Sequence, residues 1–172
     1  MDGIFGLLAL VVYVVTVALS PVLAIAVVLL ARQRSPTAAL GTVVGVLAAL
    51  VTLSTTVVAA LFSLWAAVAV FLLGFGALLG LVVVPLLLGR TVVRRATGVD
   101  REDALRLSVM AWPLALAGSF ALFVAPGGAS RYNITFLSGA AAVAAWLAWA
   151  LVVLVGPGLV GAGLARLFGR FR

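Results

Sequence analysis

Long apolar runs separated by short polar segments dominate the chain. The first run covers residues 4–31 and ends at the polar residues 32–36. A helix needs about 20 apolar residues to cross the ~30 Å hydrocarbon core of a bilayer, so this run predicts a transmembrane helix over 4–31. Ser20 and Pro21 predict a kink or tilt in its second half, because Pro21 removes a backbone donor.

The second run, residues 39–89, is about fifty residues long and contains no charged residue. One helix of that length would exceed the bilayer, so the pattern predicts a hairpin of two helices, over 39–61 and 65–89. We place the turn at Phe62 to Trp65, because tryptophan suits the membrane–water interface. The polar cluster at 54–56 is the competing position for this turn.

The only long polar segment, residues 90–106, follows this hairpin. Within it, Asp100 with Glu102 and Asp103 has the pattern of a helix N-cap followed by acidic residues in the first turn. A fourth span is therefore expected to grow from this helix over residues 107–125.

The C-terminal part begins with residues 126–133, which are rich in glycine and polar residues and predict a loop. A fifth span is expected over 135–155, where the Gly-Pro-Gly sequence at 156–158 breaks it. The tail, residues 159–172, has apolar side chains on one helical face and arginines on another. This pattern predicts an amphipathic helix that lies in the headgroup layer.

Together these segments predict an all-α integral membrane protein, a bundle of about five transmembrane helices in a single domain over residues 1–172. With five spans, every arginine except Arg131 falls on one side of the membrane. The positive-inside rule makes that side cytoplasmic, so the N-terminus is expected outside and the C-terminus inside. Arginine without lysine, beside abundant Ala, Val, Leu and Gly, favours a prokaryotic source, and hence a multi-pass protein of the cell (plasma) membrane.

The composition excludes a soluble globular domain. Hydrophobic residues make up 66% of the chain, charged residues only 9%, and the mean hydropathy is +1.40. The chain contains no histidine and no cysteine, which excludes disulfides, histidine-ligated haem and the usual zinc sites. All eleven basic residues are arginines, so a lysine Schiff base is excluded as well.

The net charge of +7 favours lipid over nucleic acid as the anionic partner, because the arginines lie in short clusters beside apolar spans. The residues expected to contact anionic lipid are Arg90, Arg94, Arg95, Arg166, Arg170 and Arg172.

No ionisable residue lies inside a predicted span. Buried carboxylates or arginines are the usual carriers of proton relays, ion coupling and voltage sensing, so these functions are disfavoured. The acids at 100–103 are explained by helix capping, and the chain supplies no further ligand for a metal site. We therefore expect no enzymatic activity, no catalytic residue and no bound metal.

Small residues recur at three- and four-residue spacing on several spans, which is typical of close helix packing in lipid. They serve either packing within the chain or docking of another subunit. These residues are Gly41, Gly45, Ala49, Thr52, Thr56, Gly76, Gly80, Ala141, Ala145 and Ala148.

Three further features allow alternative interpretations. Hydroxyl groups at Thr52, Ser54, Thr55 and Thr56 either bond back to their own helix or line a narrow polar path. No cofactor is predicted; a bound lipid or lipophilic pigment stacked on Trp146 and Trp149 is the alternative to simple packing of these rings. Asn133 begins a glycosylation sequon, a triplet that also occurs by chance.

The leading functional hypothesis is a non-catalytic accessory or scaffold subunit that packs into a larger membrane assembly, with membrane lipids and other membrane subunits as partners. The alternative is a homo-oligomeric channel or carrier for a small neutral or lipophilic solute, through the hydroxyl groups at 52–56.

Overall fold

The computed structural model describes residues 2–124 and 140–169, and this part of the chain is all helical. The helices are α1 (Asp2–Leu30), α2 (Pro36–Leu61), α3 (Leu64–Ala77), the π-helix η1 (Leu78–Val83), α4 (Val84–Thr97), α5 (Arg101–Val124) and α7 (Ala140–Gly169). Because α3, η1 and α4 follow one another without a break, five segments are long and apolar enough to cross a membrane. Five such helices suggest a multi-pass membrane protein, and their number agrees with the number of spans that the apolar runs predicted.

The turn between the second and third segments lies where the sequence placed it. Helix α2 ends at Leu61, and the Ser63 side chain caps α3 by accepting a hydrogen bond from the backbone N–H of Ala66 at 3.2 Å. The competing cluster at 54–56 lies inside α2. A serine at an N-cap satisfies one of the free N–H groups of the first helical turn, which explains why the chain reverses here.

The third segment extends further than predicted. The expected end of this helix at residue 89 is wrong, because α4 continues to Thr97, whereas α5 begins at Arg101, directly after the N-cap that the sequence placed at Asp100. Arginine is a good helix former, so a charge can end a membrane span without ending the helix. Gly98, with a φ of 70°, closes α4 in the left-handed conformation that glycine adopts without strain.

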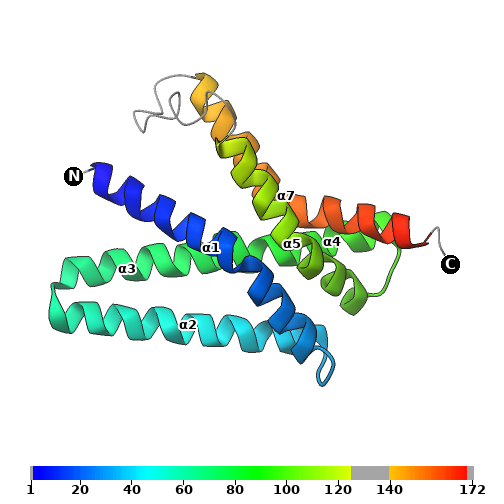
Figure 1. The fold of residues 1–172 in the computed structure, drawn as a ribbon, viewed down its shortest axis with the longest axis horizontal. Coiled ribbons are helices and arrows are strands. Elements are labelled where there is room, and N and C mark those ends of the chain that lie inside the picture. Colours follow the sequence, from blue (N-terminus) through cyan, green and yellow to red (C-terminus); the bar gives the residue numbers. More distant parts are fainter. Residues whose placement is uncertain (1, 125–139, 170–172) are drawn as a thin grey trace.

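The predicted break at residues 156–158 is also wrong. Helix α7 runs continuously from Ala140 to Gly169 with Pro157 in its interior, so residues 159–169 do not form a separate tail helix. Figure 1 shows that α7 instead changes direction about halfway along, as helices usually do at proline. Its first half follows α5 and its second half follows α4.

Three buried glycines allow α7 to pack this closely. A Cβ on Gly158 would lie 2.6 Å from the Val92 Cβ, one on Gly161 would lie 3.0 Å from the Val93 Cγ2, and one on Gly156 would lie 3.1 Å from the Ala115 Cβ. Small residues let helix backbones approach, so α7 gains packing contacts along the part of the helix that contains Pro157.

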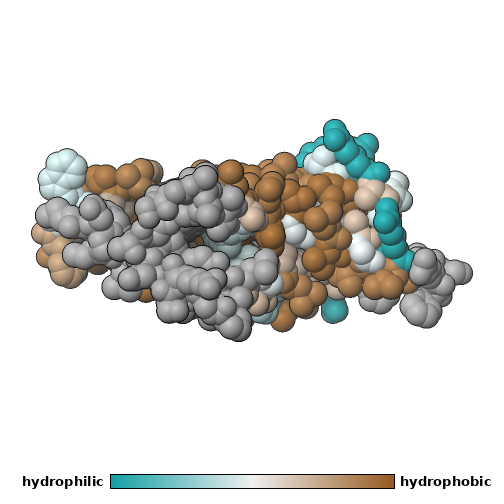
Figure 2. Space-filling view, turned by 90° about the horizontal axis from the view of Figure 1, so that it is seen from above, coloured by the Kyte–Doolittle hydropathy of each residue, from teal (hydrophilic) through white to brown (hydrophobic). Residues whose placement is uncertain are grey.

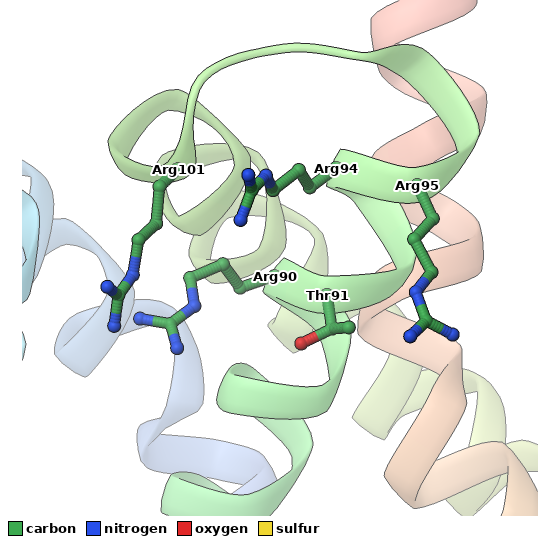
Figure 3. Close-up of a pocket in the computed structure, with 5 residues that line it drawn as sticks. All are labelled: Arg90, Thr91, Arg94, Arg95 and Arg101. Carbon is green, nitrogen blue, oxygen red and sulfur yellow. The ribbon is translucent and has the colours of Figure 1, made fainter.

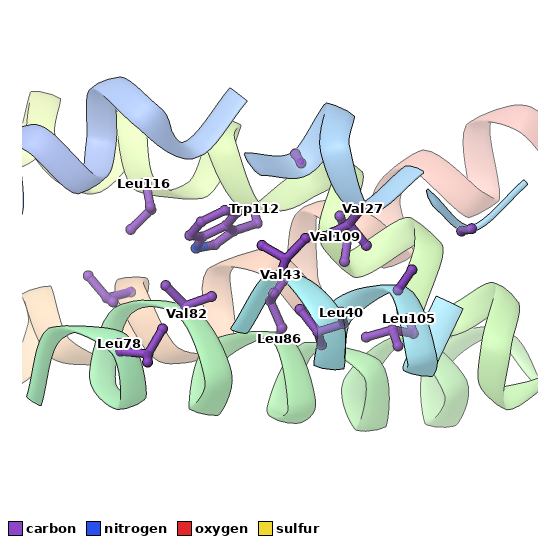
Figure 4. Packing of buried hydrophobic residues seen from close by; sticks show 14 residues of the cluster. Val27, Leu40, Val43, Leu78, Val82, Leu86, Leu105, Val109, Trp112 and Leu116 are labelled. Carbon is purple, nitrogen blue, oxygen red and sulfur yellow. The ribbon is translucent and has the colours of Figure 1, made fainter. Parts of the chain in front are cut away.

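The core lies where α1, α2, η1, α4 and α5 meet, around the almost fully buried side chain of Trp112 (Figure 4). Leu86 of α4, Val82 of η1 and Leu105, Val109 and Leu116 of α5 belong to the same buried cluster. The side chains interdigitate from several helices, as expected for a packed interior.

Trp112 also supplies a hydrogen bond at the irregular part of the third segment. Its indole N–H donates to the carbonyl oxygen of Leu81 at 2.9 Å. In an α-helix that carbonyl would accept from the N–H of residue 85, but residue 85 is a proline and has none. The tryptophan therefore replaces a donor that the helix lacks, next to the π-helical turn η1.

Polar and apolar surfaces separate along the molecule. In Figure 1, the α1–α2 and α4–α5 connections and the end of α7 lie toward the right, whereas the α2–α3 turn lies at the left. Figure 2 shows hydrophilic residues gathered at the right and a mainly hydrophobic surface over the described remainder. At the left tip, Phe62 and Trp65 are 78% and 84% exposed.

Candidate functional site

A cavity lined by arginines lies beside the turn from α4 to α5. Its volume is about 460 Å³, and its lining residues are Arg90, Thr91, Arg94, Arg95 and Arg101. We call it the arginine pocket. Because four arginines line this cavity, it is a candidate site for an anion.

The local fold brings these side chains together. Arg90 and Arg94 are four residues apart on α4 and therefore share one helical face. Gly98 ends α4, donates its N–H to the Arg94 carbonyl at 2.9 Å and turns the chain back toward Arg101. In Figure 3, the guanidinium groups of Arg90 and Arg101 lie toward each other, and Arg95 points to the other side of α4.

Thr91 contributes surface to the pocket, but its hydroxyl hydrogen is already used. The Thr91 hydroxyl donates to the Leu87 carbonyl, one turn earlier in α4, at 3.1 Å. This leaves the arginine side chains as the donors available to a ligand.

The acidic residues beside the pocket have other partners. Asp100 caps α5, as the sequence predicted: its carboxylate accepts from the Glu102 N–H at 3.0 Å. Hydrogen bonds from the backbone N–H groups of Glu102 and Arg101 hold the pKa of Asp100 below its usual range, and the charge of Arg94 acts in the same direction.

Glu102 connects the start of α5 to the start of α2. Its carboxylate accepts from the Thr37 hydroxyl at 2.7 Å and from the Thr37 N–H at 3.0 Å. This is a cap supplied by another helix, because Thr37 lies in the first turn of α2, where backbone N–H groups have no partner within the helix.

Two arginines outside the pocket donate hydrogen bonds to backbone carbonyls at the C-terminal ends of other helices. Arg106 donates to the carbonyl of Ala31, just beyond α1, at 3.4 Å, and Arg166 donates to that of Ala96, in the last turn of α4, at 3.5 Å. The structure brings three of the predicted lipid-contact residues together in the pocket, namely Arg90, Arg94 and Arg95. Arg166 lies on α7. Residues 170 and 172 lie outside the described residues.

The sequence missed Thr91 and Arg101 as members of the pocket. The available signal was Gly98, since glycine at a helix end predicts a left-handed turn that would return the chain beside α4.

The small residues of α2 form a second candidate site on the outside of the molecule. Gly41, Gly45, Ala49, Thr52 and Thr56 are all exposed, and a Cβ on Gly41 or Gly45 would meet no other atom within 4 Å. We call these five residues the α2 small-residue face.

The other predicted small residues are less informative. A Cβ on Gly76 or Gly80 would likewise meet no atom within 4 Å. Ala148 of α7 is exposed, and the side chains of Ala141 and Ala145 lie outside the described part of the structure, as does Asn133.

The hydroxyl groups of α2 bond back to their own helix. Thr52, Thr55 and Thr56 donate to the carbonyls of Ala48, Val51 and Thr52 at 2.8–3.0 Å. Ser54 and Thr56 are exposed and Thr55 is only partly buried. In this chain these hydroxyls therefore lie along an outer helix surface.

The aromatic residues of α1 and α7 meet in a polar contact inside the protein. The Trp149 indole donates to the Tyr13 hydroxyl at 3.3 Å with the rings edge-on, and the Tyr13 hydroxyl lies 2.6 Å from the Ser119 hydroxyl of α5. This joins three helices. The Trp146 side chain lies outside the described residues.

Comparison with family models, with curated proteins and with solved structures finds no match for this chain.

Proposed function

We propose that this protein is a non-catalytic multi-pass subunit of the cell membrane that packs into a larger membrane assembly through the α2 small-residue face. The observation that carries this proposal is the open space at Gly41 and Gly45, on the least buried of the five membrane-length helices.

The contrast between two sets of glycines supports this use. Gly89, Gly158 and Gly161 are buried, and a Cβ on any of them would collide with a neighbouring helix. The contacts within the chain therefore use glycines of α4 and α7, while those of α2 have no helix against them. Small residues at an exposed face of a membrane helix are typical of close helix–helix contact, since lipid chains alone do not require them.

The threonines on this face suit the same partner. The hydroxyl hydrogens of Thr52 and Thr56 are satisfied within α2, so burial against another helix would leave no unpaired donor. We therefore propose as occupant an apolar transmembrane helix of another subunit, with small residues of its own at the crossing point.

The channel or carrier hypothesis has less support. A homo-oligomeric path would need the hydroxyls at 52–56 to serve a solute between copies of the chain, whereas the hydroxyl hydrogens of Thr52, Thr55 and Thr56 are already donated to carbonyls of α2.

A bulky substitution tests the proposal without disturbing the core. Gly45→Leu should remove the partner from complexes extracted in mild detergent, because the side chain would block the approach of a second backbone. Gly118→Leu on α5 is the matched control, since Gly118 is also exposed and also open within 4 Å. Equal retention of partners by both variants would refute the α2 contact.

A further inference from the structure

The arginine pocket concentrates positive charge that no ion pair within the described residues neutralises, although Asp100 interacts through space with Arg94 and Glu102 with Arg101. Within residues 2–124 and 140–169, no carboxylate forms an ion pair with any of its four guanidinium groups. The nearby acids bond to helix N–H groups and to Thr37 instead. Arg90 and Arg94, four residues apart on α4, are a like-charge pair that destabilises a helix slightly. An anion in the pocket would relieve this repulsion.

Helix-end electrostatics explains only half of the cluster. Arg94 and Arg95 lie in the last turn of α4, where the helix dipole favours cations. Arg90 lies one turn earlier, so it is too far from the end to gain from that effect. Arg101 is the first residue of α5, where the dipole favours anions. The positions of Arg90 and Arg101 therefore require a different explanation.

The chemistry of the pocket selects the class of anion. Guanidinium groups present paired N–H donors that match the oxygens of phosphate and add charge to each hydrogen bond. A cavity of about 460 Å³ is in the range of small-molecule sites. It also lies next to apolar surface, because Leu87 and Leu88, three and two residues before Arg90 on α4, are exposed.

We propose that the arginine pocket binds an anionic phosphate group between Arg90 and Arg101, with Arg94 and Arg95 adding positive charge. The phosphate belongs either to the headgroup of an anionic phospholipid or to a soluble phosphate compound. This site is separate from the α2 small-residue face, so it does not depend on the proposed subunit contact.

The test compares two double variants with equal loss of charge. Arg90→Gln with Arg101→Gln removes the two side chains proposed to hold the phosphate. Arg32→Gln with Arg34→Gln removes two exposed arginines from the α1–α2 connection, which Figure 1 places toward the same side. Purified protein is exposed to equal amounts of phosphatidylglycerol and phosphatidylcholine, and retained lipid is counted by native mass spectrometry. Inorganic pyrophosphate is titrated in a parallel experiment.

The wild-type protein should retain phosphatidylglycerol in preference or bind pyrophosphate at millimolar concentration. The 90/101 variant should bind the preferred ligand about 100-fold more weakly, about tenfold for each charged hydrogen-bond partner, and the 32/34 variant less than about threefold more weakly. Lipid retention that pyrophosphate does not displace assigns the phosphate to the lipid, whereas displacement assigns the site to a soluble compound.

Two results would overturn the proposal. The first is a wild-type protein that retains both lipids equally and does not bind pyrophosphate, a measurement that needs no variant to fold. The second is an equal loss of binding in both double variants, which would mean that the ligand responds to overall charge and not to the pocket.

Discussion

The hydrogen bond from Trp112 to Leu81 gives the sharpest test of how the third membrane-length segment is stabilised. Trp112→Phe keeps an aromatic ring in the core but removes the N–H that donates to the Leu81 carbonyl at 2.9 Å. A hydrogen bond of this kind contributes about 1 kcal/mol net, and a buried group left without a partner costs about 1–3 kcal/mol. Measured values within membranes average about 0.6 kcal/mol and reach about 1.7.

Pro85→Ala provides the matching background. An alanine at position 85 has a backbone N–H, which can donate to the Leu81 carbonyl when the π-helical turn η1 converts to the ordinary α-helical pattern. Loss of this hydrogen bond in Trp112→Phe should therefore cost about 1–2 kcal/mol of unfolding free energy in the wild-type protein and about 1 kcal/mol less in the Pro85→Ala background, in addition to the cost of the smaller ring. The smaller ring lowers stability in both backgrounds, so its effect cancels in the double-mutant cycle.

The assay is unfolding of the four proteins of this cycle by sodium dodecyl sulfate in mixed micelles, followed by circular dichroism. Helical signal is preferable to fluorescence because one substitution removes a tryptophan. Additive effects within about 0.3 kcal/mol would refute the reasoning, since Trp112 and residue 85 would then not share the Leu81 carbonyl.

Two further predictions concern helix packing and capping. Gly158→Ala should lower the free energy of unfolding by about 2 kcal/mol, because its Cβ would lie 2.6 Å from the Val92 Cβ. A Cβ at Gly163 would meet nothing within 4 Å, so Gly163→Ala should be neutral or stabilising by up to about 1 kcal/mol. The same detergent titration measures both variants. Equal effects at the two glycines would contradict the packing of α7 on α4. The depressed pKa of Asp100 stabilises the fold at neutral pH, and this contribution is lost as the pH falls below about 3.9 and through the folded-state pKa. Asn at position 100 keeps a capping oxygen but does not titrate. The free energy of unfolding of the Asp100→Asn variant should therefore fall less steeply than that of wild type between about pH 5 and about pH 2, the range in which carboxylates titrate. Parallel curves of unfolding free energy against pH would contradict the role of the carboxylate charge.

The number of membrane-length helices and the hairpin turn could be predicted because each depends on a local property. Hydrophobic length determines whether a segment can span, and Ser63 carries the capping oxygen within three residues of its donor. The cap at Asp100 was predictable for the same reason.

The errors in helix boundaries come from reading charge and proline as helix ends. Arginines at 90–95 mark the edge of an apolar run, but the backbone continues hydrogen bonding through them to Thr97. Pro157 remains inside α7, where Gly158 lies against α4. That packing depends on a neighbouring helix that no local pattern identifies.

For the candidate sites as well, the sequence predicted local features, whereas features that depend on contacts between helices required the structure. The sequence identified the small residues of α2, but only the structure shows that Gly41 and Gly45 have no helix against them while Gly89 and Gly158 do. The arginine pocket needed the turn at Gly98 to bring Arg101 beside α4. The partner of Trp112 lies 31 residues away along the chain, so a tertiary contact determined its role.

The proposal that this protein is a subunit of a larger assembly is tested most directly by native mass spectrometry of the protein extracted gently from its own membrane. The account predicts other polypeptides bound at a fixed stoichiometry, with their release when Gly45 is replaced by leucine. A stable monomer, or copies of this chain alone, would contradict it.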